Sequence, residues 1–401
     1  MNADVKNNSN KRWLVLAILI FTYTFTFINR FIWGPLNPVV SPELGLTATQ
    51  AGLQMSAFFV GYIVTQLPAG IISDKFNPKN LLIACTIVAG VSAAAFSGVN
   101  SSMQGAALRV VSGLAGGCVL ACSSKIIFVT FPRKQLATAM GILMSGPALG
   151  ILLVNAYATP AIASMGWRAT CILTGVISIV IAALVLVFIR YEKTREAQPA
   201  PGQKTSLLDG LAAFFKNKNQ IFLGLSGFMY IVIQSAYGTW TNGYVKSVGL
   251  SPEQASIIIM SFSGVGILAT CFSGPLAVWL KLSHKSFLLL AMPLLGICAF
   301  IFSLPTSFTT LMAISLLFGL ACFLPPTHYA TSTMKIAGPA SSATAMASLN
   351  LIMSAAGVIQ PLVIGEVLDR TAYNYSYLWI ILCACGILAA LILAAVNLPK
   401  E

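Results

Sequence analysis

Charged residues are scarce in this chain of 401 residues. Aspartate, glutamate, lysine and arginine together make up 8% of it, whereas about 25% is usual in a soluble domain. A soluble fold of this length could not cover its surface with so few charges. The composition therefore excludes a cytosolic enzyme, a nucleic-acid-binding protein and a disordered protein, and we expect no nucleic acid as a partner.

Histidine is scarce as well, and the motifs of common enzymes are absent. The two histidines are His284 and His328, and no Walker-type phosphate-binding loop occurs in the sequence. The nine cysteines all fall within apolar runs, at spacings that do not suit a zinc site. We therefore expect no metal, no cofactor and no catalytic residue, and ATP is excluded as the energy source.

What the chain has instead is long apolar runs, and 57% of its residues are hydrophobic. Runs of about 20 residues are long enough for a helix to cross the hydrocarbon core of a bilayer. The first six lie near residues 13–35, 48–72, 79–98, 104–131, 136–160 and 167–190. The other six lie near residues 219–245, 254–280, 285–304, 308–333, 341–365 and 374–396. These runs are too long and too evenly apolar for barrel strands, so we predict an all-α membrane protein with twelve transmembrane helices.

The basic residues predict how these helices are oriented. With both termini in the cytoplasm, 17 of the 23 lysines and arginines fall on the cytoplasmic side and three on the outside, as the positive-inside rule requires. The net charge of +13 is then a topology signal, with anionic membrane lipids as its partners. We expect a multi-pass protein of the cytoplasmic (inner) membrane that is a monomer.

One long polar stretch, residues 191–218, separates two sets of six spans. It predicts a cytoplasmic linker between an N-terminal six-helix bundle, 1–190, and a C-terminal one, 219–401. Short matches relate the two halves. The sequence Ala-Thr-Ala-Met at 137–140 recurs 206 residues later, and Gly70 has a counterpart glycine 204 residues later. A parallel duplication of this kind predicts two pseudo-symmetric bundles and alternating access around a site at the membrane midplane.

The loop after the second span carries the most specific motif. Residues 70–79 read Gly-Ile-Ile-Ser-Asp-Lys-Phe-Asn-Pro-Lys, which resembles the Gly-x-x-x-Asp-Arg/Lys-x-Gly-x-Arg/Lys loop of the major facilitator superfamily. The resemblance implies the fold of that superfamily and a gating role for Gly70, Asp74 and Lys75. A glycine at this place allows close helix packing. Asn77 stands where the superfamily has glycine, and asparagine is the next residue most tolerant of a positive φ.

Two arginines indicate a branch of that superfamily. The sequences Ile-Asn-Arg-Phe around Arg30 and Leu-Arg-Val-Val-Ser-Gly around Arg109 resemble helices 1 and 4 of the organic anion:cation symporters. The organic anion:cation symporters, which these sequences resemble, have an arginine at each of these two positions. The family also has an acidic residue just before the first arginine and a glutamate seven residues after the second. This chain has Asn29 and Gly116 there, so the carboxylates that carry protons in the family are missing.

Positive charge inside the predicted helices is the main indication of function. Arg30, Arg109 and a secondary cation, Lys125, fall within spans, whereas none of the ten acidic residues lies at mid-membrane. A buried arginine costs about 3 to 10 kcal/mol or more, so it needs an anion or carbonyl groups as partners. We predict that the substrate supplies the anion, and the alternative is chloride or water in the empty site. Other interpretations stay open. They are Arg30 at the outer interface, Arg109 hydrogen-bonded to carbonyls of the first helix, and Lys125 snorkelling to the cytoplasmic surface.

Polar side chains at helical spacing complete the predicted binding site. They are Tyr23 and Asn29 near Arg30 in the first span, Tyr230, Gln234 and Tyr237 in the seventh, and Asn350 in the eleventh. The alternative for each of them is an ordinary hydrogen bond between helices.

His328 is the one histidine within a span, since His284 falls in a predicted cytoplasmic loop. Pro325 and Pro326 precede it and should loosen or kink their helix. With no carboxylate at hand, His328 is the candidate for binding a co-transported proton. The alternative is a neutral imidazole hydrogen-bonded to a neighbouring helix.

These features together predict a secondary active transporter of a small organic anion, a carboxylate-type metabolite, coupled to a proton or to anion exchange. The alternative is a proton-driven efflux antiporter for drugs or metabolites, because residues 141–150 partly resemble the Gly-Pro motif of such antiporters. A receptor or sensor built on the same fold is a third interpretation, which the lack of a sizeable soluble domain disfavours.

Overall fold

The computed structural model describes residues 3–66, 68–191, 207–304, 306–338 and 341–397. Within these ranges the backbone is helical apart from short connections, one of which contains a 3₁₀ turn, and no strand occurs. The all-α class predicted from the sequence is therefore confirmed.

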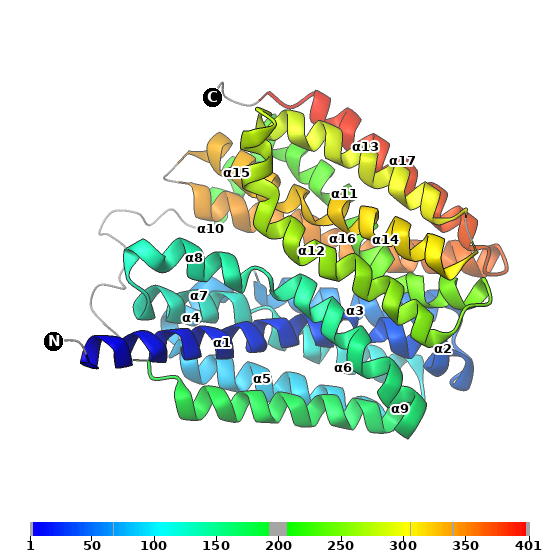
Figure 1. The fold of residues 1–401 in the computed structure, drawn as a ribbon, viewed down its shortest axis with the longest axis horizontal. Coiled ribbons are helices and arrows are strands. Elements are labelled where there is room, and N and C mark those ends of the chain that lie inside the picture. The colour runs from blue at the N-terminus through cyan, green and yellow to red at the C-terminus, as the bar shows by residue number, and fades with distance from the viewer. Residues whose placement is uncertain (1–2, 67, 192–206, 305, 339–340, 398–401) are drawn as a thin grey trace. The chain divides into compact units, whose positions relative to one another are not determined.

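The helices follow one another along the chain with short connections (Figure 1). In the first half they are α1 (Ala3–Phe31), α2 (Trp33–Glu43), α3 (Ala48–Gln66), α4 (Ala69–Lys75), α5 (Pro78–Ala95), the 3₁₀ turn Phe96–Gly98, α6 (Ser102–Gly116), α7 (Val119–Thr130), α8 (Arg133–Leu143) and α9 (Gly146–Phe188). In the second half they are α10 (Leu207–Lys216), α11 (Lys218–Ser247), α12 (Pro252–Trp279), α13 (His284–Phe302), α14 (Phe308–Phe323), α15 (Pro325–Ala337), α16 (Ser342–Arg370) and α17 (Tyr375–Ala394).

The chain divides into two compact units. Unit 1 comprises Met1–Val40 and Ala57–Gln198, and unit 2 comprises Ser41–Ser56 and Pro199–Glu401. The segment Ser41–Ser56, which contains the end of α2 and the start of α3, therefore groups with unit 2 although it precedes most of unit 1 in sequence. The division of the chain into two repeated six-helix halves stays a prediction.

Among the described residues, ten helical stretches are long and apolar enough to cross a membrane. One of them, Lys134–Phe188, has 55 residues and would be about 80 Å long as a straight helix, whereas the hydrocarbon core is about 30 Å thick. Gly166 interrupts it with a φ of 81°, between the predicted spans 136–160 and 167–190. The stretch is therefore long enough for two crossings.

Five predicted spans are each divided between two helices. The predicted span 13–35 is divided between α1 and α2, 48–72 between α3 and α4, 104–131 between α6 and α7, 136–160 between α8 and α9, and 308–333 between α14 and α15. In the last case Pro325 and Pro326 occupy the first two positions of α15, where a missing N–H does no harm. The expected loosening of this helix by its two prolines is confirmed.

Each unit contains a helix crossing made possible by a glycine. In unit 1, a Cβ atom on Gly113 of α6 would overlap the carbonyl oxygen of Phe58 on α3. In unit 2, a Cβ atom on Gly319 of α14 would overlap the carbonyl oxygen of Phe262 on α12. These glycines are 206 residues apart in the sequence, and the phenylalanines 204. The crossings thus repeat at the offsets found in the sequence.

A second pair of contacts repeats in the same way. α5 lies beside α9 in unit 1, and α13 lies beside α17 in unit 2 (Figure 1). Lys79 of α5 donates to the carbonyl oxygen of Leu186 near the end of α9 at 2.9 Å. Lys285 of α13, 206 residues later, donates to the carbonyl oxygen of Ala394 at the end of α17 at 3.0 Å. A lysine near carbonyls that lack an intrahelical partner is favourable in both places.

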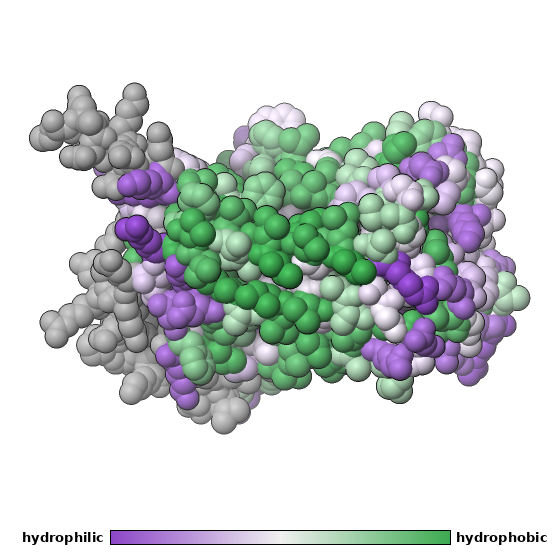
Figure 2. Space-filling model, turned by 90° about the horizontal axis from the view of Figure 1, so that it is seen from below, coloured by the Kyte–Doolittle hydropathy of each residue, from purple (hydrophilic) through white to green (hydrophobic). Residues whose placement is uncertain are grey.

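The surface carries an apolar region suited to lipid. On the face shown in Figure 2, hydrophobic residues gather across the middle and hydrophilic residues lie towards the two ends. In unit 1, exposed apolar side chains recur along α5 and α9, among them Ile87, Val91, Ile172, Val176, Ile179, Leu184 and Val187. Contiguous exposed apolar surface of this kind marks a membrane-facing region.

Candidate functional site

Arg30 lies near the end of α1 and is 9% exposed. Four aromatic rings surround its guanidinium group, with the ring centroids 4.5 to 5.5 Å from Cζ. The rings belong to Phe27, Phe58, Phe59 and Tyr62, and we call this set the aromatic cage. Each such contact is worth roughly 0.5 to 2 kcal/mol. The ring faces stabilise the cation by cation–π contacts, but they do not provide oxygen or nitrogen acceptors for its N–H groups.

The guanidinium of Arg30 is left with unused hydrogen-bond donors. Its Nε and Nη2 atoms are buried and have no hydrogen-bond partner among the described residues. The buried polar side chains of the described part of the chain include no aspartate or glutamate. A buried charge without a hydrogen-bonded counter-ion is costly, so this arrangement is suited to an anion that is not part of the chain.

Local packing explains how the aromatic cage forms. Phe58, Phe59 and Tyr62 lie within one turn of α3, so their side chains can gather around a single group. The backbone of that turn approaches α6 closely, because Gly61 and Gly113 have no side chain at the crossing. The fourth ring, Phe27, precedes Arg30 by three residues on α1.

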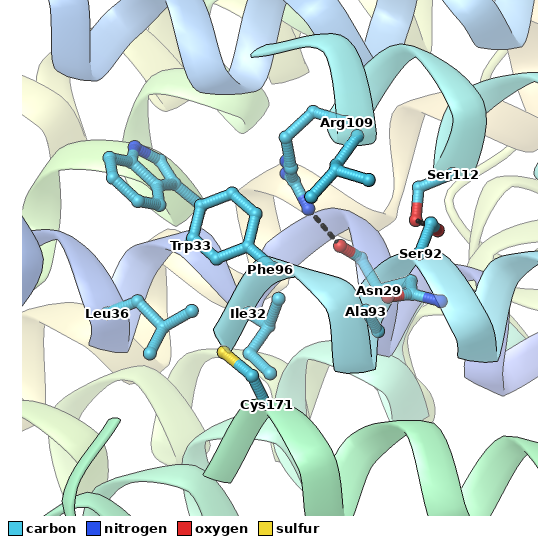
Figure 3. A pocket seen from close by; sticks show the side chains of 11 residues that line it. Asn29, Ile32, Trp33, Leu36, Ser92, Ala93, Phe96, Arg109, Ser112 and Cys171 are labelled. Carbon is cyan, nitrogen blue, oxygen red and sulfur yellow. Dashed lines mark hydrogen bonds between the residues drawn. The ribbon is translucent and has the colours of Figure 1, made fainter. Parts of the chain in front are cut away.

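Arg109 lies on α6 and is fully engaged by the protein. It is 4% exposed, and its Nη1 atom donates to the carbonyl oxygen of Asn29, as Figure 3 shows. Its Nη2 atom donates to the carbonyl oxygen of Arg30 at 2.7 Å. These carbonyls lie in the last turn of α1, where acceptors lack intrahelical partners. This geometry matches the interpretation of Arg109 as a hydrogen-bond centre for the first helix, and its contact with substrate stays a prediction.

A small pocket lies beside Arg109 within unit 1. Its polar lining includes Asn29, Ser92 and Ser112, and the two serine hydroxyls are 2.8 Å apart. Trp33 and Phe96 contribute to its apolar lining (Figure 3). The Asn29 side chain donates to the carbonyl oxygen of Ala89 on α5 at 3.3 Å. The Asn29 side chain is therefore hydrogen-bonded to α5, whereas the Arg30 side chain packs against α3.

The other position of a missing family carboxylate is Gly116. A Cβ atom there would lie 2.9 Å from Cγ2 of Thr26, with the rings of Tyr62 and Phe58 at 3.5 and 3.6 Å. Two of these three neighbours belong to the aromatic cage of Arg30. The organic anion:cation symporters have a glutamate at this position. Glycine here leaves room for the aromatic rings beside it.

Tyr23 and Lys125 complete the unit 1 candidates. Tyr23 is 5% exposed, packs edge-on against Phe27 at 5.2 Å, and lies within electrostatic range of Arg30 and Tyr62. A Cβ atom on Gly146 of α9 would lie 2.6 Å from its ring, so α9 covers one side. Lys125 is half-buried on α7. Tyr23 thus contacts Phe27, a member of the aromatic cage.

The unit 2 candidates do not form one shared face. Gln234 donates from Nε2 to the hydroxyl of Tyr230 at 2.9 Å. Tyr237 instead stacks on Phe262 at 4.0 Å and pairs with the Ser315 hydroxyl inside an aromatic core. Asn350 of α16 is half-buried. The structure thus brings Tyr230 and Gln234 together and places Tyr237 in the unit 2 core.

His328 has a partner that the sequence did not indicate. Its Nδ1 atom lies 2.9 Å from Nδ1 of His284, and its Nε2 atom lies 3.1 Å from Oγ of Ser273. The sequence placed His284 in a loop, whereas it is the first residue of α13. His328 is completely buried.

The predicted gating loop differs from expectation in its details. No described atom lies within 4 Å of the position that a Cβ atom on Gly70 would take, so Gly70 is not at a close crossing here. Lys75 is exposed, and the Asp74 side chain lies outside the described part. Asn77 has a φ of −64°, so the tolerance of asparagine for a positive φ is not used at this position. Its side chain accepts from the backbone N–H of Lys79 at 2.9 Å and caps α5, a role that asparagine performs well.

A carboxylate at the start of α3 is a second feature that the sequence did not indicate. Asp369 of α16 accepts from the backbone N–H groups of Ala48 and Thr49 at 2.6 and 2.9 Å and from the Thr49 hydroxyl at 2.7 Å. All three residues belong to unit 2. An anion at a helix N-terminus is stabilising because it satisfies free N–H groups and the helix dipole.

Comparisons with known proteins agree with this picture. The sequence profile of the Major Facilitator Superfamily matches residues 19–361. A hexuronate transporter of Bacillus subtilis is 24% identical over 378 residues, which cover 89% of this chain and 88% of the relative. A Cupriavidus necator protein named a probable sulfoacetate transporter is 24% identical over 422 residues, covering 99% and 98%.

Solved structures show the same fold. A bacterial homologue of the human lysosomal transporter Spinster, in an inward-facing and unoccupied conformation, has a TM-score of 0.78 at 17% identity and covers 98% of this chain and 99% of its own. The nucleoside transporter NupG has a TM-score of 0.79 at 16% identity, covering 95% and 99%. The family profile, the relatives and the fold agree. The chain therefore belongs to the Major Facilitator Superfamily and is a multi-pass membrane transporter rather than an enzyme.

Proposed function

We propose that the protein is a secondary active transporter of a small organic anion, with Arg30 as the group that binds the anion. The observation that carries the proposal is the buried guanidinium with two nitrogen atoms that lack a hydrogen-bond partner. A carboxylate or sulfonate can accept two parallel hydrogen bonds from one guanidinium group. Such a ligand would supply both the missing acceptors and the missing negative charge.

The relatives support an anionic substrate. The two proteins compared above carry names of transporters for a hexuronate and for sulfoacetate, and both of these compounds are small organic acids. An E. coli relative, 25% identical over 419 residues, is named a probable L-galactonate transporter. A carboxylate-type metabolite is therefore the substrate class we propose. Tyr23, Tyr230, Gln234 and Asn350 are proposed to hydrogen-bond its uncharged part.

The proposal includes alternating access by a monomer with twelve crossings in the cytoplasmic membrane and both termini in the cytoplasm. The ten apolar stretches give this number if α3 crosses once and Lys134–Phe188 crosses twice. The two proposed halves are residues 1–190 and 219–401. The repeated glycine crossings and the repeated lysine contacts support two equivalent halves.

Uptake of an anion needs an energy source. Moving one negative charge inward against a potential of 100 mV, negative inside, costs about 2.3 kcal/mol. Coupling to a proton or exchange for another anion would offset this cost, and His328 is the proposed proton-binding residue. The alternative, a proton-driven exporter of drugs or metabolites, predicts a different substrate class.

The test is transport by the purified protein in liposomes. We expect liposomes preloaded with unlabelled glucuronate, a hexuronate, to take up labelled glucuronate by counterflow, and sulfoacetate and other organic acids to compete. A neutral hexose of the same size is the matched control and should not compete. Counterflow of a lipophilic cation, with no counterflow of any organic acid, would contradict the proposal and favour the exporter.

A further inference from the structure

The two histidines of the chain meet inside unit 2, although 44 residues separate them. His284 begins α13 and His328 lies in the first turn of α15. The Phe287 ring stacks on the His328 ring, with the centroids 4.0 Å apart. Ala277 and Ala291 belong to the buried apolar cluster that contains Phe287. The His328 ring thus has an apolar face and two polar contacts, one at each nitrogen.

The hydrogen bonds of Ser273 determine which nitrogen atom of His328 carries a hydrogen. The Ser273 hydroxyl lies 2.7 Å from the carbonyl oxygen of Leu324 and must donate to it, because a carbonyl cannot donate. The hydroxyl has one hydrogen, so it accepts at its other contact, which is Nε2 of His328. His328 therefore carries a hydrogen on Nε2. When His328 is neutral, its Nδ1 atom is an acceptor, and His284 must donate from its own Nδ1.

One added proton fits this pair without loss of a hydrogen bond. If His328 is protonated on Nδ1, it donates across the 2.9 Å contact, and His284 accepts on Nδ1 while its own hydrogen sits on Nε2. The bond is kept and its direction is reversed. A second added proton would place hydrogens on both Nδ1 atoms, which removes the bond and brings two cations together.

We propose that His284 and His328 form one proton-binding site that takes up and releases a single proton in each transport cycle. This inference rests on the proposed function, because the proton compensates the charge of the transported anion. A monovalent anion that moves with one proton carries no net charge across the membrane.

The surroundings make the proton exchangeable rather than permanently bound. Burial disfavours a cation, and both imidazoles lie in first turns of helices, where the dipole also disfavours it. The contacts of His328 with Ser273 and with the second imidazole are the hydrogen bonds available to the added proton. A site with this balance can release its proton.

The charged groups of the elements packed against α15 are few. α13 contributes Lys285, which is bonded to carbonyls at the end of α17, and α15 itself contributes Lys335, two turns after His328. α14 contains no charged residue. Glu253 of α12 precedes Ser273 by 20 residues, or about 30 Å of helix. The remaining charged residues of the packed helices α11 and α16 are Lys218, Lys246, Glu366, Asp369 and Arg370.

Tyr329, the titratable neighbour of His328 on α15, pairs with the Ser226 hydroxyl of α11 at 2.6 Å. It is directed to α11, whereas the contacts of His328 are with α12 and α13. The described contacts of His328 therefore give the proton one partner that can also titrate, His284.

The test separates proton coupling from anion binding. Liposomes contain the wild-type protein, His328→Gln, His284→Gln or the double variant, together with a pH-sensitive dye in the lumen. Glucuronate counterflow requires no net proton movement, whereas accumulation driven by a pH gradient does. We expect each single variant to keep counterflow within about threefold of wild type and to lose accumulation by tenfold or more. The double variant should match the singles, because the two residues form one site.

Several outcomes would overturn the inference. Accumulation retained by both single variants shows that the pair is not the coupling site, and additive losses in the double variant show two independent sites. If the variants do not fold, the inference is tested by the number of protons that enter with each anion transported by the wild type. One proton entering per monovalent anion supports the site, whereas none or two contradicts it. Absence of counterflow in the wild type would instead contradict the proposed function, so the two failures are distinguishable.

Discussion

The two units handle buried polar groups in different ways. Unit 1 buries two guanidinium groups, Arg30 and Arg109, whereas the buried polar side chains described in unit 2 include neither lysine nor arginine. In unit 2 some uncharged polar side chains bond to one another, as Tyr230 does with Gln234 and Tyr237 with Ser315. The crossings of the two units are nevertheless equivalent. The same framework therefore holds different groups: two buried guanidinium groups in unit 1, and hydrogen-bonded uncharged side chains and the histidine pair in unit 2.

A second contrast lies within unit 1 itself. Arg109 donates to two backbone carbonyls, whereas two nitrogen atoms of Arg30 have no hydrogen-bond partner in the described chain. Both guanidinium groups are close to Phe58, with Cζ 5.5 Å from the ring centroid for Arg30 and 5.1 Å for Arg109. This difference indicates a structural role for Arg109 and a ligand-binding role for Arg30, and the first two predictions below each test one side of it.

The largest expected effect is on transport by Arg30→Gln. Removing one partner of a buried hydrogen-bonded charge pair costs about 2 to 5 kcal/mol, which is roughly 30- to several-thousand-fold in affinity. Glucuronate counterflow in liposomes should fall by about 100-fold or more. Arg30→Lys should restore only part of it, because lysine lacks the two-pronged donor. Arg168→Gln, which changes an exposed arginine stacked on Trp167, is the control and should transport normally.

The next largest effect is on the stability of Arg109→Met. This change leaves the carbonyl oxygens of Asn29 and Arg30 without their donor, and hydrogen bonds to a charged group are worth about 1.5 to 3 kcal/mol each. We expect the free energy of unfolding to fall by about 3 kcal/mol, seen as a lower melting temperature in detergent. Unchanged melting together with lost transport would make Arg109 a second ligand-binding residue and would remove the contrast with Arg30.

A smaller effect tests the equivalence of the two frameworks. Gly113→Ala and Gly319→Ala each place a Cβ atom against a backbone carbonyl, and overpacking of this kind costs about 1 to 3 kcal/mol. Both variants should melt at lower temperature by similar amounts. Gly274→Ala is the matched control, because no atom lies within 4 Å of its added Cβ. If only one of the two crossing variants is destabilised, the crossings are not equivalent.

The smallest effect concerns Asp369→Asn. The loss of a carboxylate at the N-terminus of α3 should cost about 0.5 to 2 kcal/mol, measured by melting in detergent. Glu366→Gln is the control. Glu366 is exposed and paired with Arg370 at 2.7 Å, and exposed pairs contribute about 0 to 1 kcal/mol. Its contact with α3 is the Thr49 hydroxyl at 3.3 Å rather than a backbone N–H group. Equal melting of Asp369→Asn and wild type would show that this cap does not stabilise unit 2.

The sequence predicted those features that depend on local composition. Apolar runs gave the all-α membrane class, and Pro325 with Pro326 gave the break before α15. Arg30 and Arg109 were found because a charge within an apolar run is conspicuous. Each of these signals is contained in a short segment of the chain.

Features that depend on contacts between distant segments could not be predicted. Asp369 and Thr49 are 320 residues apart, and nothing in either segment identifies the other. His284 was missed because a helix boundary is uncertain by a few residues, which placed it in a loop. The aromatic cage was missed because the sequence does not tell which face of α3 turns to α1. The capping role of Asn77 was not predicted, because helix capping and a positive φ favour the same residue type.

We propose above that the Arg30 guanidinium binds an anion that is not part of the chain. One thermal-shift measurement tests this most directly. Purified wild type and Arg30→Met are melted in detergent with and without a large excess of glucuronate. Ligand at about 100 times its dissociation constant stabilises a protein by about 2.7 kcal/mol. We predict that wild type gains such a shift, and that Arg30→Met melts at or above the temperature of ligand-free wild type and gains none. An Arg30→Met protein that melts well below ligand-free wild type, or that still gains the full shift, would contradict the account.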